Sequence, residues 1–383
     1  MHISAFDFEL PEELVAQHPP RQRGESRLLV LDRRTGAITH AMFSQLPEFL
    51  RRGDRLVLND TRVFPARLLG HRVPSGGAVE CLLVRPLPQP SNLEPSNPRT
   101  LEPSNLEPSN RRTLEPSDPG SRIPSPEMYW EALMHPGQKL KPGARVVFEG
   151  DDAVIEGEVL ERHFHGRRTI RLTARHGVMQ AIERIGHIPL PPYIKRADTS
   201  EDRERYQTVF AREPGSIAAP TAGLHFTPSI LASLQSDGVR LVYVTLHVGY
   251  GTFKPVRVDD IEEHRVDPET FSVPAAATRE LVDARAQQGR IIAVGTTTTR
   301  VLESLQDHVD SQRDLAGTTD LFIRPGHQFH FVDGLVTNFH LPRSSLLLLV
   351  AAFGGREQVL AAYREAVAQR YRFYSYGDAM LIV

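Results

Sequence analysis

Cysteine is almost absent from this chain, since Cys81 is the only one in 383 residues. A single cysteine cannot form an intrachain disulfide or supply a cysteine-based zinc site, which excludes secreted disulfide scaffolds. Histidine is more frequent, with 16 residues. The pairs His163/His165 and His327/His330 nevertheless lack acidic or cysteine ligands at a recognisable spacing. We therefore expect no metal site.

Long apolar segments and the standard nucleotide motifs are also missing. The longest apolar run, Leu346–Phe353, is too short to cross a bilayer. The first residues show no basic segment followed by an apolar run, so we expect no signal peptide. No Gly-x-Gly-x-x-Gly or Walker A sequence occurs, which removes the usual signatures of dinucleotide and triphosphate binding. These absences predict a cytoplasmic protein without a membrane partner.

The composition is that of a globular protein, with 40% hydrophobic and 24% charged residues. The formal net charge of -2 neither indicates nor excludes RNA binding, because a local basic patch is enough for it. One segment departs from this composition. Residues 92–126 repeat the unit LEPSN or LEPSD and contain few apolar residues. Such a segment cannot bury enough surface to offset its chain entropy, so we expect a disordered surface loop.

The runs on either side of this loop predict two kinds of structure. Short β-rich runs bounded by Gly, Pro and Asp are typical of a small antiparallel barrel or sandwich, which we place at 64–176. After residue 177, helical patterns alternate with apolar strands, as in an open α/β sheet. The predicted fold class is α/β: an open α/β main domain formed by residues 1–63 and 177–383, with an inserted small antiparallel β-barrel domain that contains the loop.

Polar residues follow several predicted strands of the main domain. Residues 290–304 contain a strand, a glycine, four threonines and the start of a helix, whose free N–H groups suit an anion. The strand ending at His247 is followed by Gly249 and Gly251, which let a backbone approach a ligand. In open α/β sheets, ligands bind at the carboxyl ends of the strands. We therefore expect a site there.

Three further stretches combine polar and turn-forming residues. "RLVLNDTRV" ends a strand with a carboxylate and a guanidinium two residues apart, a pattern suited to ribose hydroxyls and phosphate. "APTAGLHFT" and "TNFHLP" each place a histidine beside residues that form turns. Taken alone, the first stretch is better explained by a surface ion pair, and each of the other two histidines is equally well explained as a buried structural residue.

Taken together, these stretches are more specific. The chain resembles the S-adenosylmethionine:tRNA ribosyltransferase-isomerases of queuosine biosynthesis, from its first residues to its last and apart from the LEPSN segment. Asp267 stands where the family usually has His, which argues against an essential histidine there. The matching blocks are "DFELPEELVAQHPP", "LVLNDTRVFPARLLG", "IPLPPYIKR", "YQTVFAREPGSIAAPTAGLHFT", "LHVGYGTFKPV", "VGTTTTRVLES", "TDLFIRPGHQFHFVDGLVTNFHLPRSSLLLLVAAFGG" and "YRFYSYGDAMLI".

The resemblance implies an α/β body with an inserted β-barrel, and it implies a reaction. The ribosyl part of S-adenosylmethionine is transferred to 7-aminomethyl-7-deazaguanine at the tRNA wobble position and isomerised to an epoxycyclopentane-diol, while adenine and methionine leave. S-adenosylmethionine is then a co-substrate, and no bound cofactor is expected. The chemistry needs a base for a ribose C5′ proton, a hydrogen bond for departing adenine and a basic surface for RNA.

Within this framework we assign candidate residues. His225 and His340 are candidates for proton transfer, because a neutral imidazole acts near pH 7; a structural role for each stays open. Arginines and tyrosines near the predicted junctions are candidates for tRNA binding, through phosphate contacts and stacking. The substrate-binding candidates are Asp60, Arg62, Thr221, Gly223, Gly249, Thr252, Thr297, Arg300 and Asn338. The tRNA-binding candidates are Arg67, Arg72, Tyr193, Arg196, Arg203, Arg205, Tyr206 and Arg212.

Two other classes of protein remain as alternatives. A non-catalytic RNA-binding module would bind RNA without releasing adenine, and a methyltransferase would leave S-adenosylhomocysteine. The strand-end clusters argue against the first, and the lack of a glycine-rich loop paired with an acidic strand end argues against the second. A monomer is the simplest expectation for the assembly.

Overall fold

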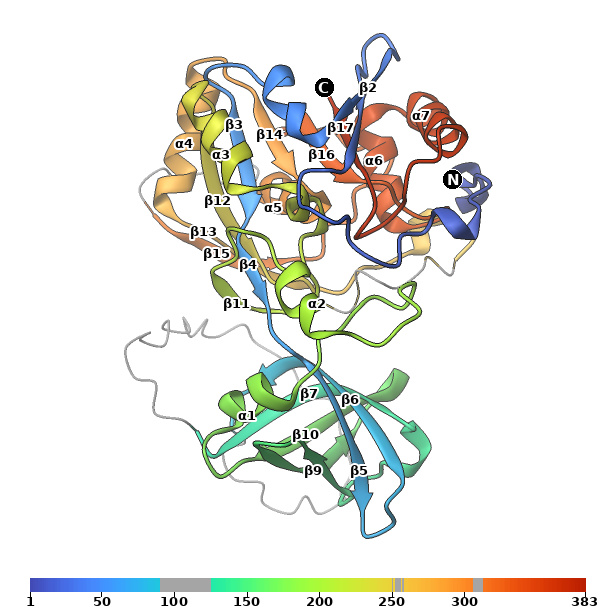
Figure 1. The fold of residues 1–383 in the computed structure, drawn as a ribbon, viewed down its shortest axis with the longest axis vertical. Helices are drawn as coiled ribbons and strands as arrows, with labels where there is room; N and C mark the ends of the chain where they lie inside the picture. Colours follow the sequence, from blue (N-terminus) through green and yellow to red (C-terminus); the bar gives the residue numbers. More distant parts are fainter. Residues whose placement is uncertain (90–124, 250, 252–255, 257, 306–312) are drawn as a thin grey trace, which may run out of the picture. The chain divides into compact units, whose positions relative to one another are not determined.

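The computed structural model describes residues 1–89, 125–249, 251, 256, 258–305 and 313–383 (Figure 1). Most of the predicted LEPSN loop and the candidate Thr252 lie outside the described residues. The chain divides into two compact units, residues 1–65 with 188–383 and residues 66–187. The predicted α/β fold with a barrel is confirmed, because one unit carries a nine-stranded sheet and the other a closed barrel.

The smaller unit is a six-stranded antiparallel barrel in the order β10-β7-β6-β5-β8-β9. Its strands alternate, as in β10, where Arg168, Ile170 and Leu172 are buried between half-buried neighbours. Large side chains such as Trp130 and Phe148 fill the interior. The strands are β5 (Arg67–Val73), β6 (Ala78–Leu87), β7 (Glu127–His135), β8 (Arg145–Glu149), β9 (Val154–Arg162) and β10 (Arg167–Thr173).

The barrel unit ends at His187, eleven residues beyond the boundary expected from the sequence. The difference is the helix α1 (Val178–Ile185), which the sequence pattern placed with the main domain. Its first amide donates to Ser125 O over 3.0 Å. Ile185, the last residue of the helix, packs closely on Gly150: a Cβ added to Gly150 would lie 2.7 Å from Ile185 Cγ2. The helix therefore completes the barrel core.

The larger unit is built on a sheet in the order β15-β13-β12-β3-β14-β16-β17-β1-β2. The four strands β12, β3, β14 and β16 run parallel to one another, so their carboxyl ends meet at one edge. A short parallel pair, β4 (Thr61–Val63) with β11 (Glu213–Ser216), lies outside this sheet. The sheet strands are β1 (Arg27–Leu31), β2 (Ile38–Met42), β3 (Arg55–Asn59), β12 (Arg240–Leu246), β13 (Glu269–Val273), β14 (Ile291–Val294), β15 (Leu315–Thr319), β16 (Gly334–Asn338) and β17 (Ala379–Ile382).

The central strands are apolar on both faces because each face packs on helices. Val57 belongs to one core with α4–α7, whereas its neighbours Leu56 and Leu58 belong to the other core with α3, as the pleat of β3 requires. Among the described residues no single helix is long and apolar enough to cross a membrane, although the bent pair α6–α7 passes that test jointly. The helices are α2 (Ser200–Arg205), α3 (Pro228–Ser236), α4 (Ala275–Ala286), α5 (Thr296–Leu305), α6 (Ser345–Gly354) and α7 (Arg356–Ala368).

Candidate active site

A cavity of about 360 Å³ lies where β14 and β16 end. Its lining residues come from segments far apart in the sequence that converge on this edge of the sheet. Most of its surface is apolar, and its polar side chains are almost all neutral. The polar side chains that line it include Thr221, Thr296, Thr297, Asn338, His340 and Tyr374. This is the form of a small-molecule site, with an apolar body and a few convergent polar groups.

The turn from β14 into α5 builds one wall of this cavity. Gly295 adopts φ +90°, a conformation that favours glycine, and lets the chain start the helix at once. The four threonines that follow divide into two pairs. Thr298 and Thr299 donate to the carbonyls four residues before them, the ordinary hydrogen bond of a helical threonine with its own backbone. Thr296 and Thr297 line the cavity.

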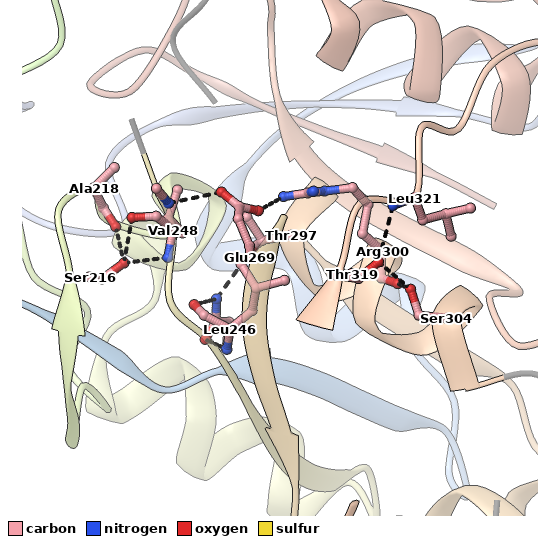
Figure 2. Close-up of polar contacts among 12 residues, drawn as sticks. Ser216, Ala218, Leu246, Val248, Glu269, Thr297, Arg300, Ser304, Thr319 and Leu321 are labelled. Carbon is pink, nitrogen blue, oxygen red and sulfur yellow. Dashed lines mark hydrogen bonds and ion pairs between the residues drawn. The ribbon is translucent and has the colours of Figure 1, made fainter. Parts of the chain in front are cut away.

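Two buried polar side chains, Asn59 and Ser216, hold the end of β12 and the residues after it in place (Figure 2). Asn59, at the end of β3, donates to Leu246 O and accepts from Leu246 N, both over 3.0 Å, and its Nδ2 lies 3.5 Å from Thr297 Oγ1. Ser216 Oγ donates to Ala218 O over 2.8 Å and accepts from Val248 N over 2.7 Å. Ala218, Val248 and Thr297 are thereby fixed as cavity wall.

His340 lines the cavity, and its hydrogen bonds define its tautomer. Thr337 Oγ1 lies 3.3 Å from Asn338 O and 2.9 Å from His340 Nε2. The hydroxyl's contact with the Asn338 carbonyl favours the tautomer in which the imidazole Nε2–H donates to the hydroxyl. In this tautomer Nδ1 is unprotonated, and it has no hydrogen-bond partner among the described residues. Burial lowers the pKa of His340 to about 3, so the ring is neutral at pH 7.

His225, the other predicted proton-transfer residue, does not line the cavity. It is 4% exposed and belongs to the short 3-10 helix Thr221–His225. Its ring bonds Ser26 Oγ over 2.9 Å and Asn338 Nδ2 over 3.0 Å. Burial lowers its pKa to about 4. Asn338 therefore stands between this histidine and the cavity.

An ion-pair cluster occupies the same edge of the sheet beside β12 and β13, and Figure 2 shows its Glu269–Arg300 pair. We use this name for Asp60, Arg212, Glu269 and Arg300. Glu269 pairs with Arg300 and accepts from Gly249 N over 2.8 Å, and both paired side chains are at least 90% buried. Asp60 accepts from Arg212 and from Thr245 Oγ1 over 2.8 and 2.7 Å. These charges are already matched within the protein.

Comparison with known proteins agrees with the resemblance seen in the sequence. Residues 3–382 match the family model described as "Queuosine biosynthesis protein". The chain belongs to this family. It is 47% identical over the full length of both chains to an S-adenosylmethionine:tRNA ribosyltransferase-isomerase of Syntrophotalea carbinolica. To the proteins of that name from Anaeromyxobacter dehalogenans and Nitratidesulfovibrio vulgaris it is 50% and 49% identical, covering 99–100% of this chain and 97–99% of theirs.

A solved structure supports the same family and fold. The crystal structure of a S-adenosylmethionine tRNA ribosyltransferase from Thermotoga maritima aligns with a TM-score of 0.51 at 36% identity. The alignment covers 99% of this chain and all of that one. Both the main sheet and the barrel unit are therefore features of a family member, and the site candidates can be placed on that fold.

The structure brings together only some of the predicted substrate-binding residues. Thr221, Thr297 and Asn338 line the cavity with His340. Gly223 does not line the cavity. Its Cα faces Thr208 instead, since a Cβ there would lie 2.8 Å from Thr208 Cγ2. Arg62 is exposed on β4. Asp60, Gly249 and Arg300 are engaged in or beside the ion-pair cluster instead.

The predicted tRNA-binding residues are scattered and several are occupied. Arg196 makes a bidentate pair with the buried Asp202, whose pKa is lowered despite its burial by this arginine and by Thr199 and Tyr376. Tyr206 is fully buried beside Tyr376, which leaves no ring face for a base. Tyr193 lines the cavity and packs on Tyr374 with ring centroids 3.9 Å apart.

The remaining tRNA candidates differ in exposure. Arg203 is exposed on α2, and Arg205 donates to Pro20 O and Arg21 O and pairs with Glu201. Arg212 is 60% exposed at its side chain while bonded to Asp60. In the barrel unit, Arg67 pairs with Glu80 over 2.7 Å and Arg72 is half-buried.

Sequence reasoning missed several residues that the structure brings to the cavity. Tyr374 and Ser375 come from the C-terminal segment, in which the sequence analysis assigned no site residue. Ser344, which caps α6, and its neighbour Ser345 lie in the block "PRSSLLLLV". Among the described residues, no group of three or more His, Cys, Asp or Glu side chains is placed to hold a metal ion.

Proposed function

We propose that this protein transfers and isomerises the ribosyl moiety of S-adenosylmethionine onto 7-aminomethyl-7-deazaguanine at the tRNA wobble position. The products are epoxyqueuosine in tRNA, adenine and methionine. The observation that carries the proposal is full-length similarity, at 45–50% identity, to proteins named as S-adenosylmethionine:tRNA ribosyltransferase-isomerases. The cavity at the strand ends supplies a place for the donor substrate.

The charge of the cavity supports a sulfonium substrate that loses a proton. Among the described residues that line it, none is acidic, and its one charged side chain is Arg343, which also bonds Asp7. A carboxylate beside the sulfonium would neutralise the charge that makes the C5′ hydrogen acidic, and it would repel the carbanion that forms. A wall of threonine, serine, asparagine and histidine avoids both effects.

His340 is the residue we assign to proton transfer. It lines the cavity, and burial keeps the ring neutral. Its Nδ1 is unprotonated in the tautomer that the contacts of Thr337 favour. A neutral imidazole is the form that can take the C5′ proton. The proton taken by Nδ1 passes on to departing adenine, which leaves as the neutral base. Arg343 is the cation available for the methionine carboxylate.

Product analysis tests this proposal. The protein is incubated with S-adenosylmethionine and an anticodon stem-loop that carries 7-aminomethyl-7-deazaguanine, and the same stem-loop with guanine serves as control. We expect adenine, methionine and an RNA heavier by the epoxycyclopentane-diol, only with the modified RNA. S-adenosylhomocysteine with a methyl-sized gain would show a methyltransferase. RNA binding without any turnover would show a binding module.

A further inference from the structure

Asn338 has an amide group whose orientation is dictated by its neighbours. Its Nδ2 lies 3.1 Å from Tyr374 O and 3.0 Å from His225 Nε2. A carbonyl can only accept a hydrogen bond, so the nitrogen and not the oxygen must face Tyr374. Both amide hydrogens are then used. The oxygen, Oδ1, is buried and has no donor among the described residues, although Asn338 lines the cavity.

This orientation also decides the state of His225. Since Asn338 Nδ2 donates to Nε2, that nitrogen carries no proton, and the ring proton lies on Nδ1, which donates to Ser26 Oγ over 2.9 Å. Only the neutral ring satisfies both bonds, and burial among groups such as Phe43 keeps it neutral. Both nitrogens are engaged, so His225 has no lone pair to offer to the cavity.

We infer that Asn338 Oδ1 accepts a hydrogen bond from the nucleoside half of S-adenosylmethionine, and that His225 is a positioning residue that holds this oxygen in place. A buried acceptor without a donor is costly, and a ligand that brings a donor removes that cost. The nucleoside offers two sources of such a donor, the ribose hydroxyls and the adenine amine. The inference rests on the proposed function for the identity of the ligand.

A neutral acceptor suits this reaction better than a carboxylate would. In a site where negative charge develops at C5′, an amide oxygen orients a hydroxyl or amine without adding a charge. Asp60 is the carboxylate that the sequence suggested for the ribose hydroxyls. In the structure Arg212 and Thr245 hold it outside the cavity. Asn338 thus provides the acceptor that an acidic strand end supplies in other nucleoside sites.

Two substitutions of His225 separate positioning from proton transfer. His225→Gln keeps an acceptor for Asn338 Nδ2, whereas His225→Phe keeps the volume without one. We expect His225→Phe to raise the Kd for S-adenosylmethionine about tenfold while kcat at saturation stays within a few-fold, and His225→Gln to stay near wild type. Loss of kcat in both variants would overturn the inference, as would an unchanged Kd in His225→Phe. Circular dichroism and thermal unfolding check the fold.

Binding of substrate analogues gives a second test, which does not depend on substituting His225. The probes are S-adenosylmethionine, its 2′-deoxy and 3′-deoxy forms, and the form with a 6-oxo group in place of the adenine amine. We expect one probe to bind about tenfold more weakly, and to lose nothing further in Asn338→Ala. Loss with a deoxy probe identifies the ribose as donor, and loss with the 6-oxo probe identifies the base. Equal binding of all probes would contradict the inference.

The same samples distinguish this inference from the proposed function. Adenine release by the wild-type protein with modified RNA reports the function alone. If adenine is released but the analogues bind alike, the inference about Asn338 fails and the function stands. If the analogues differ as expected but no adenine appears, the transferase-isomerase proposal fails and the binding role of Asn338 stands.

Discussion

The cavity and the ion-pair cluster use neighbouring strands of one sheet and the same carboxyl edge, but they treat polar groups in opposite ways. In the cluster, Arg300 faces Glu269 and Arg212 faces Asp60, so each charge has its partner inside the protein. In the cavity, the polar groups other than Arg343 are neutral, and Asn338 Oδ1 and His340 Nδ1 have no partner among the described residues. The charges of the cluster are matched inside the protein, whereas neutral groups without a partner are left for a ligand.

The largest effect that could break this comparison concerns Arg300. Removing it in Arg300→Met leaves the buried carboxylate of Glu269 without its counterion, and we expect a loss of about 3–5 kcal/mol in the free energy of unfolding. The double variant Glu269→Gln/Arg300→Met should recover most of this loss. Urea unfolding of both variants measures it.

Binding separates the two roles of this arginine. The double variant should bind S-adenosylmethionine nearly as the wild type does, because neither residue lines the cavity. An Arg300→Met protein of normal stability that no longer binds S-adenosylmethionine would instead make Arg300 a substrate ligand, and the division between cluster and cavity would not hold.

His340 carries the next effect. We expect His340→Gln to fold and to lower single-turnover adenine release by at least about 100-fold, because a positioned proton acceptor contributes that much. His40→Gln is the matched control, since His40 lies on the edge strand β2, bonds Tyr371 and does not line the cavity. Equal adenine release by wild type and His340→Gln would remove the proton-transfer assignment.

The dependence of stability on pH is the third test. His225 and His340 have folded-state pKa values of about 4 and about 3, below the ordinary 6.5. The unfolded chain therefore binds more protons as the pH falls below 6.5, so each histidine destabilises the fold progressively until its folded pKa is reached. The slope is about 1.4 kcal/mol per pH unit for each. Urea unfolding between pH 7 and 4.5 should show a shallower slope in His225→Gln. An identical slope would contradict the burial argument.

The smallest effect is expected in the barrel unit. Strands β6 and β7 pair directly on either side of residues 90–124, with Leu87 opposite Tyr129. Replacing 90–124 by a short Gly/Ser turn should leave adenine release within about twofold, because that pairing closes the barrel without them. A large loss of activity would give the repeat segment a function.

Much of the fold could be predicted because local patterns decide it. The runs at 55–60 and 290–295 predict strands and those at 274–289 and 356–371 predict helices, and the structure has these elements at 55–59, 291–294, 275–286 and 356–368. The sequence did not predict the short strands β13, β15 and β17. Segments of four or five residues without a distinctive pattern become strands only because they pair with a neighbouring strand. Helix α1 was assigned to the wrong unit because its sequence shows a buried face but not which core covers it.

The place of the candidate site could be predicted from the sequence, but its detail could not. Strand-end polarity predicts a site at the carboxyl edge of the sheet, and the structure has a cavity there that Thr297, Asn338 and His340 line. The sequence could not show that Asp60 and Arg300 would find partners, since Glu269 lies 31 residues from Arg300 and Arg212 lies 152 from Asp60. Likewise, Tyr374 and Ser375 reach the cavity only through the packing of the C-terminal segment.

The decisive measurement is a crystal structure with S-adenosylhomocysteine, the analogue of the donor that lacks the sulfonium charge. We expect the ligand in the cavity, within hydrogen-bond distance of Asn338 and beside His340 and Thr297. A ligand bound beside Glu269 and Arg300, with that ion pair opened and the cavity empty, would contradict it.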